Sequence, residues 1–336
     1  MHPATIPFQI TDWQHVPRTE HPGDTGMAYW QTRQFGNLRV RLVTYSADYQ
    51  ADHWCQRGHI LYIIEGELDT QLADGRVFRL TAGVSYEVSD ELSSHRSLTQ
   101  TGATLFIVDG GFLAVKKPAT LIDLSHTIEN GLITYKGLPA PVICDYLSRE
   151  NSRKLYAEGT EFQIGKIEMV TNTGTYLDCP FHRYADGPDL SQVGLEAFTD
   201  LEGIMIHVPH TESLAITLNH VRDYAVKDRA VLLHTGWDAH WNTEAYYTHH
   251  PYVTAEAATY LRDAGAKLVG IDSHNIDDTT GNERPVHTIL LGANCLIVEH
   301  LCNLSALPGS GFTFSAIPPK IKGVGTFPVR AMARVG

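Results

Sequence analysis

Apolar stretches in the first third of the chain are short and separated by turn residues. They are rich in Val, Ile, Leu and Tyr and lie at 38–46, 59–73, 74–80 and 103–110. Asp74-Gly75 opens the third stretch with a hairpin signal. No helical period accompanies these stretches. Many short strands without helices predict an all-β sandwich or barrel, which we place at residues 1–115.

The later part of the chain mixes strand and helix patterns. Ala257 and Leu261 share one face of a helix predicted at 255–264, with Thr254 as its N-cap and Gly265 as its stop. Strands are predicted around this helix at 203–209, 230–237, 267–272 and 295–301. These patterns predict a second, mixed α/β domain.

A polar segment separates the two patterns. Lys116-Lys117-Pro118 cannot continue a strand ladder, because proline lacks the backbone donor. We therefore place a linker near residues 113–120 and the second domain at 119–336.

Composition narrows the functional classes. The chain has 336 residues, 43% of them apolar and 19% charged, which suits two globular domains. Its formal charge of −12 argues against nucleic acid or an anionic membrane as partner. The N-terminus lacks a signal-peptide pattern, and the five cysteines are scattered, so we expect a cytoplasmic protein with reduced thiols. The 18 histidines indicate acid–base or metal chemistry.

Cys55 and His59 form the first candidate cluster, together with His95. Residues 55 and 59 have the same parity, so on an extended strand their side chains point the same way. Thiolate and imidazole ligands favour zinc, copper or iron over magnesium or calcium. The alternative is that the two histidines are hydrogen-bonded core residues and Cys55 is a small buried hydrophobe.

The segment that begins at Asp52-His53-Trp54-Cys55 resembles the cupins that carry a DHCW-like signature. His95 lies twelve residues after Gly83, as the second cupin motif requires. The resemblance implies a β-barrel with a bound metal. This sequence departs from the usual ligand set, since Cys55 and His59 stand where that set has His and Glu.

The richest motif is "NTGTYLDCPFHRYADG" at 172–187. On a strand, Asn172, Tyr176 and Asp178 would face one cavity because they share parity. Pro180 should end the strand and leave His182 at the rim of that cavity.

This motif resembles the signature H-x-G-T-H-x-D-x-P-x-H of the kynurenine formamidase/cyclase family. Further similar blocks lie at 123–130, 234–241, 269–277, 287–304 and 314–331. The resemblance implies a swivelling β/β/α fold and hydrolysis of amide or lactam C–N bonds. It also implies His182 as the acid–base residue. The family's metal ligands correspond to positions 172, 176, 178, 287 and 299.

Asn172 and Tyr176 replace two of the imidazole ligands that the family pattern has. An amide and a neutral phenol bind zinc weakly, so we expect at most a weakly held divalent metal, zinc or manganese, at Asp178, His287 and Glu299. Tyr176 is a candidate for orienting a substrate carbonyl. The remaining substrate-binding candidates are Asn172, His274 and Trp237.

The leading interpretation is a hydrolase of a small amide, an arylformamide or a cyclic amide, with Asp178, Tyr176 and His182 as catalytic residues. One alternative is a metabolite-binding or sensor protein without catalysis. Another is a metal-free lyase or isomerase in the same pocket. The expected partners are a small-molecule substrate and a second copy of the chain, because members of the family are commonly dimers.

Overall fold

The computed structural model describes residues 6–114 and 119–336. The chain divides into two compact units, Met1–Lys117 and Pro118–Gly336. Residues 115–118, at the centre of the predicted linker, lie outside the described residues. That the two units are independently folding domains stays a prediction. In the described part of the chain, no helix is long and apolar enough to cross a membrane.

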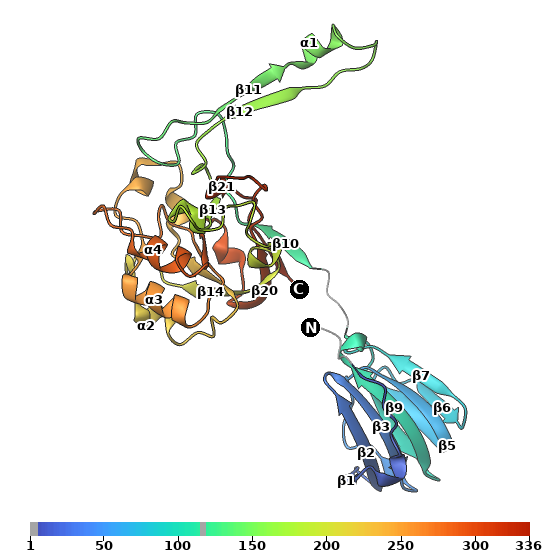
Figure 1. Ribbon diagram of the computed structural model, residues 1–336. Coiled ribbons are helices and arrows are strands. Elements are labelled where there is room, and N and C mark those ends of the chain that lie inside the picture. Colours follow the sequence, from blue (N-terminus) through green and yellow to red (C-terminus); the bar gives the residue numbers. More distant parts are fainter. Residues whose placement is uncertain (1–5, 115–118) are drawn as a thin grey trace. The chain divides into compact units, whose positions relative to one another are not determined.

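The N-terminal unit is built around the 14-residue strand β5 (His59–Leu72) (Figure 1). The first half of β5 pairs with β7 and β9, and its second half pairs with β6 and β8. All pairings in this unit are antiparallel. The other strands are β1 (Arg18–Pro22), β2 (Met27–Phe35), β3 (Leu38–Tyr45), β4 (Tyr49–Gln50), β6 (Val77–Thr81), β7 (Ser85–Val88), β8 (His95–Thr99) and β9 (Ala103–Gly110).

The core of this unit follows the alternation of its strands. Leu61 and Ile63 of β5 are buried, whereas Tyr62 and Ile64 between and after them are exposed. The turn predicted at Asp74-Gly75 separates β5 from β6, and Gly75 has a φ of +93° that other residues rarely adopt. The all-β prediction agrees with this unit, and a closed cupin barrel stays a prediction.

The C-terminal unit contains a nine-stranded sheet in the order β10-β22-β20-β14-β16-β18-β19-β13-β21. Its four central strands are parallel, and the flanking strands are antiparallel. The central strands are β14 (Leu201–His207), β16 (Ala230–His234), β18 (Leu268–Ile271) and β19 (Leu296–Glu299). The flanking strands are β10 (Thr120–Asp123), β13 (Tyr176–Asp178), β20 (Ser310–Ser315), β21 (Thr326–Pro328) and β22 (Met332–Val335).

Two apolar cores lie against this sheet. Val231 and Leu233 of β16 belong to one core, and Ala230 and Leu232 belong to the other, as expected for a strand buried on both faces. The first core is completed by α2 (Leu218–Val221), α3 (Ala255–Asp263) and α4 (Pro285–Leu291), which cover that face (Figure 1). The C-terminal unit is mixed α/β, as predicted, while its swivelling character stays a prediction.

Helix α3 begins and ends as its sequence predicts. The side chain of Thr254 accepts a hydrogen bond from the backbone of Ala257, and Gly265 has a φ of +85° just beyond the helix. Helix α4 was not predicted. It begins at Pro285, a residue that suits the first helical position because its missing N–H would have no partner there.

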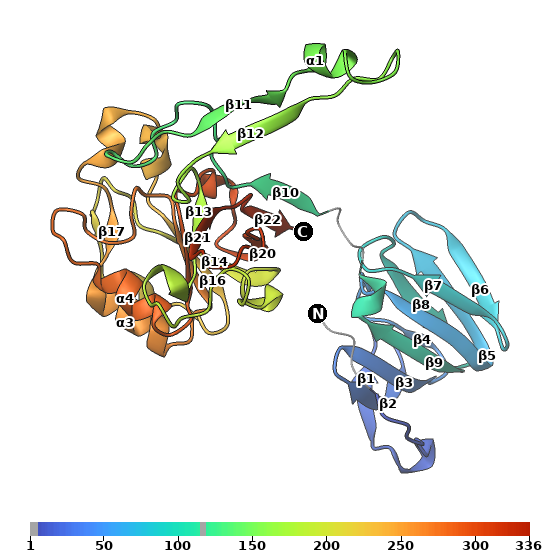
Figure 2. The same cartoon turned by 45° about the horizontal axis from the view of Figure 1, so that its top comes forward.

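A two-stranded arm extends from the body of the C-terminal unit (Figures 1 and 2). It consists of β11 (Val142–Leu147), α1 (Arg149–Arg153) and β12 (Ile164–Glu168). A second small sheet pairs β15 (Ala215–Ile216) with β17 (Tyr252–Val253). The sequence patterns predicted neither of these sheets.

Candidate functional site

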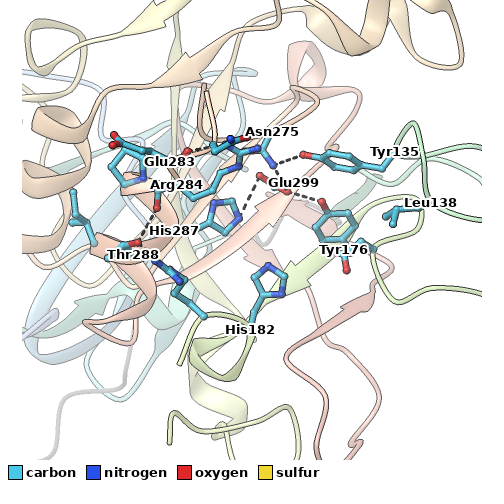
Figure 3. A pocket seen from close by; sticks show the side chains of 15 residues that line it. Tyr135, Leu138, Tyr176, His182, Asn275, Glu283, Arg284, His287, Thr288 and Glu299 are labelled. Atoms are coloured by element: carbon cyan, nitrogen blue, oxygen red, sulfur yellow. Dashed lines mark hydrogen bonds and ion pairs between the residues drawn. The ribbon is translucent and has the colours of Figure 1, made fainter. Parts of the chain in front are cut away.

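A cavity of about 830 Å³ opens beside β13, β19 and the start of α4. Figure 3 shows the side chains of Tyr176, His182, His287 and Glu299 directed toward this common space. The lining residues that carry polar or charged groups are Tyr135, Asn172, Tyr176, His182, Arg183, Asn275, Asn282, Glu283, Arg284, His287, Thr288 and Glu299.

Tyr176 and Glu299 lie on the floor of the cavity. They are directly opposite each other in the antiparallel β13–β19 pair, so their side chains share one face of the sheet. The Tyr176 hydroxyl donates a hydrogen bond of 2.6 Å to Glu299 Oε2, and the backbone N–H of Ile276 donates one of 2.7 Å to Oε1. Burial raises the pKa of Glu299 to about 7.

His182 stands at the rim, in the short turn that follows β13. Thr326 lies opposite Asp178 in the β13–β21 pair, and its hydroxyl donates to Asp178 Oδ1. The same hydroxyl oxygen lies 2.7 Å from His182 Nδ1. Because the hydroxyl has one proton, which goes to Asp178, Nδ1 of His182 must be the donor in this contact. In the neutral ring, Nε2 then carries the lone pair.

His287 enters the site from the first turn of α4. Its Nδ1 donates to Asp277 Oδ2 at 2.6 Å, while the other oxygen of Asp277 accepts from the backbone of Val286. Although burial lowers the pKa of His287, Asp178 and Asp277 raise it to about 10. Its Nε2 lies 3.7 Å from Asp178 Oδ2 and 3.8 Å from Glu299 Oε1. Both distances are too long for hydrogen bonds.

Of the substrate-binding candidates predicted from sequence, one lines the cavity and two do not. Asn172 lines the cavity, but from a loop, because β13 begins only at Tyr176. The expected strand from 172 to 178 is therefore wrong, and Gly174, with a φ of +66°, interrupts the alternation. His274 and Trp237 are buried and are absent from the described cavity lining, so a role in substrate binding stays a prediction.

Sequence reasoning missed the groups that orient the site. Thr326 and Asp277 hold His182 and His287, but their partners lie 144 and 10 residues away in the chain. Beneath the floor of the cavity, His300 joins two tyrosines. The Tyr246 hydroxyl lies 2.9 Å from His300 Nδ1, and His300 Nε2 lies 3.3 Å from the Tyr176 hydroxyl oxygen. The Thr326 contact depends on the β13–β21 register, and the other contacts join loops, helices and strand β13, which only the fold brings together, so local sequence gives no signal for them.

The residues present do not fit the five-ligand metal site that the resemblance implies. Asn172 and Tyr176 replace two imidazoles, and both oxygens of Glu299 already accept hydrogen bonds. Asp178, His182 and His287 do offer ligand atoms within 4.8 Å of one another, and Asp178 Oδ2 is buried without a hydrogen-bond partner in the described structure. A zinc or manganese ion held there would need the His182 ring as a ligand.

The N-terminal unit contains a second cluster. Cys55, His59 and His95 offer ligand atoms that lie within 4.8 Å of one another, so the three candidates of the first motif do come together. Burial raises the pKa of Cys55, but hydrogen bonding with His59, with His95 and with the backbone of Arg57, together with the charge of His59, lowers it to about 5.

The comparisons that follow concern the C-terminal unit. Residues 122–278 match the family model described as putative cyclase. The C-terminal unit resembles the cyclase family. Over 213 residues, the chain is 28% identical to a kynurenine formamidase of Geobacillus thermodenitrificans, covering 63% of this chain and 96% of that protein. A kynurenine formamidase of Bacillus cytotoxicus is 25% identical over 222 residues, or 65% of this chain and 99% of that protein.

Solved structures show the same fold. Isatin hydrolase A from Labrenzia aggregata superposes with a TM-score of 0.56 at 22% identity, covering 65% of this chain and 94% of that protein. The cyclase-family resemblance made from the motif at 172–187 is thereby confirmed for the C-terminal unit.

Proposed function

We propose that the C-terminal unit hydrolyses the C–N bond of a small amide, an arylformamide or a cyclic amide, with His182 as its acid–base residue. The observation that carries this proposal is the contact chain from Asp178 through Thr326 to His182. This chain orients the ring and gives Nε2 the lone pair that a general base needs. The sequence similarity to kynurenine formamidases, whose name describes hydrolysis of a formamide, supports the same reaction class.

The reaction needs two proton transfers, and His182 can perform both. Nε2 takes a proton from water while the water oxygen attacks the carbonyl carbon. The imidazolium that forms is stabilised through Thr326 by the buried carboxylate of Asp178. It then returns the proton to the nitrogen as the C–N bond breaks. One water is consumed, and the products are a carboxylic acid and an amine, which stay in one molecule when the amide is cyclic.

The developing oxyanion needs a donor, and His287 is the group best suited to that role. Because its pKa is raised to about 10, the His287 ring carries a proton on both nitrogens near neutral pH. Nδ1–H donates to Asp277, whereas Nε2 lies 3.7 and 3.8 Å from two carboxylate oxygens, so its N–H is not used in a hydrogen bond with either of them. A substrate carbonyl oxygen can accept from this N–H. The Tyr176 hydroxyl is less suited, because it already donates to Glu299.

No step of this reaction passes through a metal ion. The donor set is altered at positions 172 and 176, and a residual ion at Asp178 and His287 would recruit His182 and remove it from proton transfer. Acid–base catalysis by His182 and metal binding by His182 are therefore competing hypotheses, and we propose the first.

Substitution of His182 tests the proposal. Aryl formamides and isatin serve as substrates, and the wild-type chain is expected to hydrolyse at least one of them. His182→Gln should lower kcat by ~10²–10⁴, the usual contribution of general acid–base catalysis. His240→Gln, a histidine outside the described cavity lining, serves as the matched control. Full activity of the His182 variant would refute the mechanism, and binding without turnover across the panel would favour the sensor alternative.

A further inference from the structure

Three arginines of the N-terminal unit gather around a single buried carboxylate. Arg39 and Arg41 lie on β3 and point to the same face of the sheet as Val43, a fully buried core residue. Asp109 of β9 stands directly opposite Arg39. Arg57 belongs to the segment that leads into β5. Strand pairing therefore brings charged groups to the side of the sheet that faces the apolar core.

Asp109 is fully buried and accepts hydrogen bonds from two of these arginines. Nε of Arg39 donates to Oδ1 at 2.9 Å, and Nη2 of Arg41 donates to Oδ2 at 2.7 Å. Nε of Arg57 lies 3.7 Å from Oδ1, which is an ion pair without a hydrogen bond. Three guanidinium groups thus share one carboxylate, so the group of four side chains has two more positive charges than negative ones.

No second carboxylate of the described chain pairs with this arginine cluster. Among the described residues, Asp109 is the one acidic side chain within 4.0 Å of the three guanidinium groups. The residues outside the described part, 1–5 and 115–118, contain neither Asp nor Glu. Because an uncompensated charge inside a protein is costly, an anion is the expected partner of the cluster.

Arg41 has a donor that the protein does not use. The residue is 7% exposed, and its Nε is buried without a hydrogen-bond partner in the described structure. The guanidinium carbon lies 4.6 Å from the centre of the Trp30 ring, which covers one face of the group and leaves its N–H edge for a ligand. Burial lowers the pKa of Arg41, and the charge of Arg39 lowers it further, although Asp109 raises it. An additional anion would relieve both effects.

The exposure of the three side chains increases from the inner arginine to the outer one. The side chains of Arg41, Arg39 and Arg57 are 8%, 24% and 59% exposed. Solvent therefore reaches the cluster past Arg57, and only a small ligand can contact the inner groups. A carboxylate fixed on the surface of another protein would pair with Arg57 alone.

We propose that Arg39, Arg41 and Arg57 form a binding site for a small carboxylate. The planar guanidinium fork matches a carboxylate with two parallel hydrogen bonds, which the ammonium group of lysine cannot do. Arg39 and Arg57 contact Asp109 through Nε, so their Nη groups remain for the ligand. The hydrolysis proposed for the C-terminal unit releases a carboxylic acid and would supply a ligand of this class. That link, unlike the site itself, rests on the proposed function.

Titration calorimetry of the full-length chain with acetate tests the site, with chloride holding the ionic strength constant. Arg57→Gln should weaken acetate binding at least ~10-fold, the loss expected when a charged hydrogen-bond partner is removed. This variant leaves the Arg39–Asp109–Arg41 contacts intact, so the unit should still fold. The matched control is Arg79→Gln, an exposed arginine of the same unit that pairs with Glu67. Its acetate affinity should equal that of the wild type. Equal affinities in the two variants overturn the proposal.

A second measurement needs no variant and locates the ligand directly. Phenylglyoxal modifies accessible arginines, and mass spectrometry identifies each modified residue. Acetate should protect Arg57 of the wild-type chain and leave Arg79 reactive. Acetamide, which has the shape of acetate without its charge, should protect neither residue. Equal modification of Arg57 with and without acetate, or equal protection by acetamide, overturns the site.

Both measurements are independent of turnover in the C-terminal unit. A chain that binds acetate at Arg57 and hydrolyses no amide would support the carboxylate site and contradict the proposed hydrolase. A chain that hydrolyses an aryl formamide without protection of Arg57 by acetate would do the reverse.

Discussion

Tyr176 lies directly opposite Glu299 in the β13–β19 pair and donates its hydroxyl proton to Oε2 of that carboxylate over 2.6 Å. The resemblance to the cyclase family implies metal ligands at both positions. Here the Tyr176 hydroxyl is hydrogen-bonded to the Glu299 carboxylate, so the two side chains contact each other where the family pattern has two metal ligands. The replacement of two imidazoles at positions 172 and 176 can therefore be tested in two ways, by restoring the histidines and by removing any bound metal from the wild type.

Restoring the imidazoles should create a metal site. We expect the double variant Asn172→His/Tyr176→His to bind zinc at least ~100-fold more tightly than the wild-type C-terminal unit, since each new imidazole is a strong zinc ligand. Competition with a chromophoric chelator measures the affinity, in a Cys55→Ser background that removes the N-terminal thiolate. The control Asn172→Gln/Tyr176→Phe changes the same positions without adding ligands. An equal affinity in both double variants would contradict the prediction.

Chelation should leave the C-terminal activity largely intact. The reason is that proton transfer by His182 requires no ion in the proposed mechanism. Activity toward the aryl formamide is measured after prolonged dialysis against a strong chelator, together with the metal content of the chain. Loss of activity on chelation, reversed by zinc or manganese, would show that His182, Asp178 and His287 bind an essential metal instead.

Thr326 should act as a positioning residue for His182. Thr326→Val removes the hydroxyl that joins His182 to Asp178, and we expect kcat to fall by ~10–100-fold with little change in KM. The pH profile of kcat should move at the same time, because the imidazolium loses its carboxylate support. Thr326→Ser should restore both readouts. A variant that lowers only thermal stability would indicate a merely structural role.

The proposed catalytic residues of this site could be predicted from sequence, whereas the residues that orient them could not. Tyr176, Asp178 and His182 lie within seven consecutive residues, so a local motif is enough to place them together. Thr326 reaches them through the β13–β21 register across 148 residues from Asp178. Periodicity also failed at Asn172, because the positive φ of Gly174 ends the alternation on which the parity argument depends.

The fold likewise has parts that the sequence predicts and parts that it does not. Strands buried on both faces, such as β16 and β18, produce apolar runs that are visible in the sequence, and the N-cap and stop of α3 are local signals. The arm of β11 and β12 has no such signal. Its apolar residues are exposed on both strands, so the rule that apolar positions mark a core does not apply to it.

Acid should destabilise the C-terminal unit through two neutral histidines, the buried His274 and the half-buried His126. Burial lowers the pKa of His126 to about 4 and that of His274 to about 3. The unfolded chain takes up these protons near pH 6.5 and the folded chain does not. Their contribution to the free energy of unfolding is therefore complete above about pH 6.5 and is lost as the pH falls toward 4.

Urea unfolding between pH 4 and 7 measures this effect. His126→Phe keeps an aromatic ring against Trp241, on which the imidazole stacks at 3.9 Å, and should flatten the pH dependence by roughly 1–3 kcal/mol. His53→Gln, an exposed histidine, is the control and should leave the slope unchanged. An identical slope in His126→Phe and the wild type would show that His126 does not contribute.

The arm should mediate the homodimer expected from the sequence. Ile143 and Ile167 are paired across β11 and β12, and they are 36% and 60% exposed. Tyr146 and Leu155 are 77% and 70% exposed. A two-stranded sheet is marginally stable in water, and apolar patches of this kind usually mark an interface, so we expect a second copy of the chain to cover the arm.

Light scattering on the full chain tests the arm. The wild type should have twice the monomer mass of 37.3 kDa, and Ile143→Ser/Ile167→Ser should weaken the dimer at least ~10-fold, because burial of each isoleucine contributes about 1.5–3 kcal/mol. Lys166→Ser, an exposed polar position on the same strand β12, should leave the dimer intact. A wild-type monomer at micromolar concentration would refute the homodimer. A double variant that dimerises as tightly as the wild type would place the interface elsewhere on the chain.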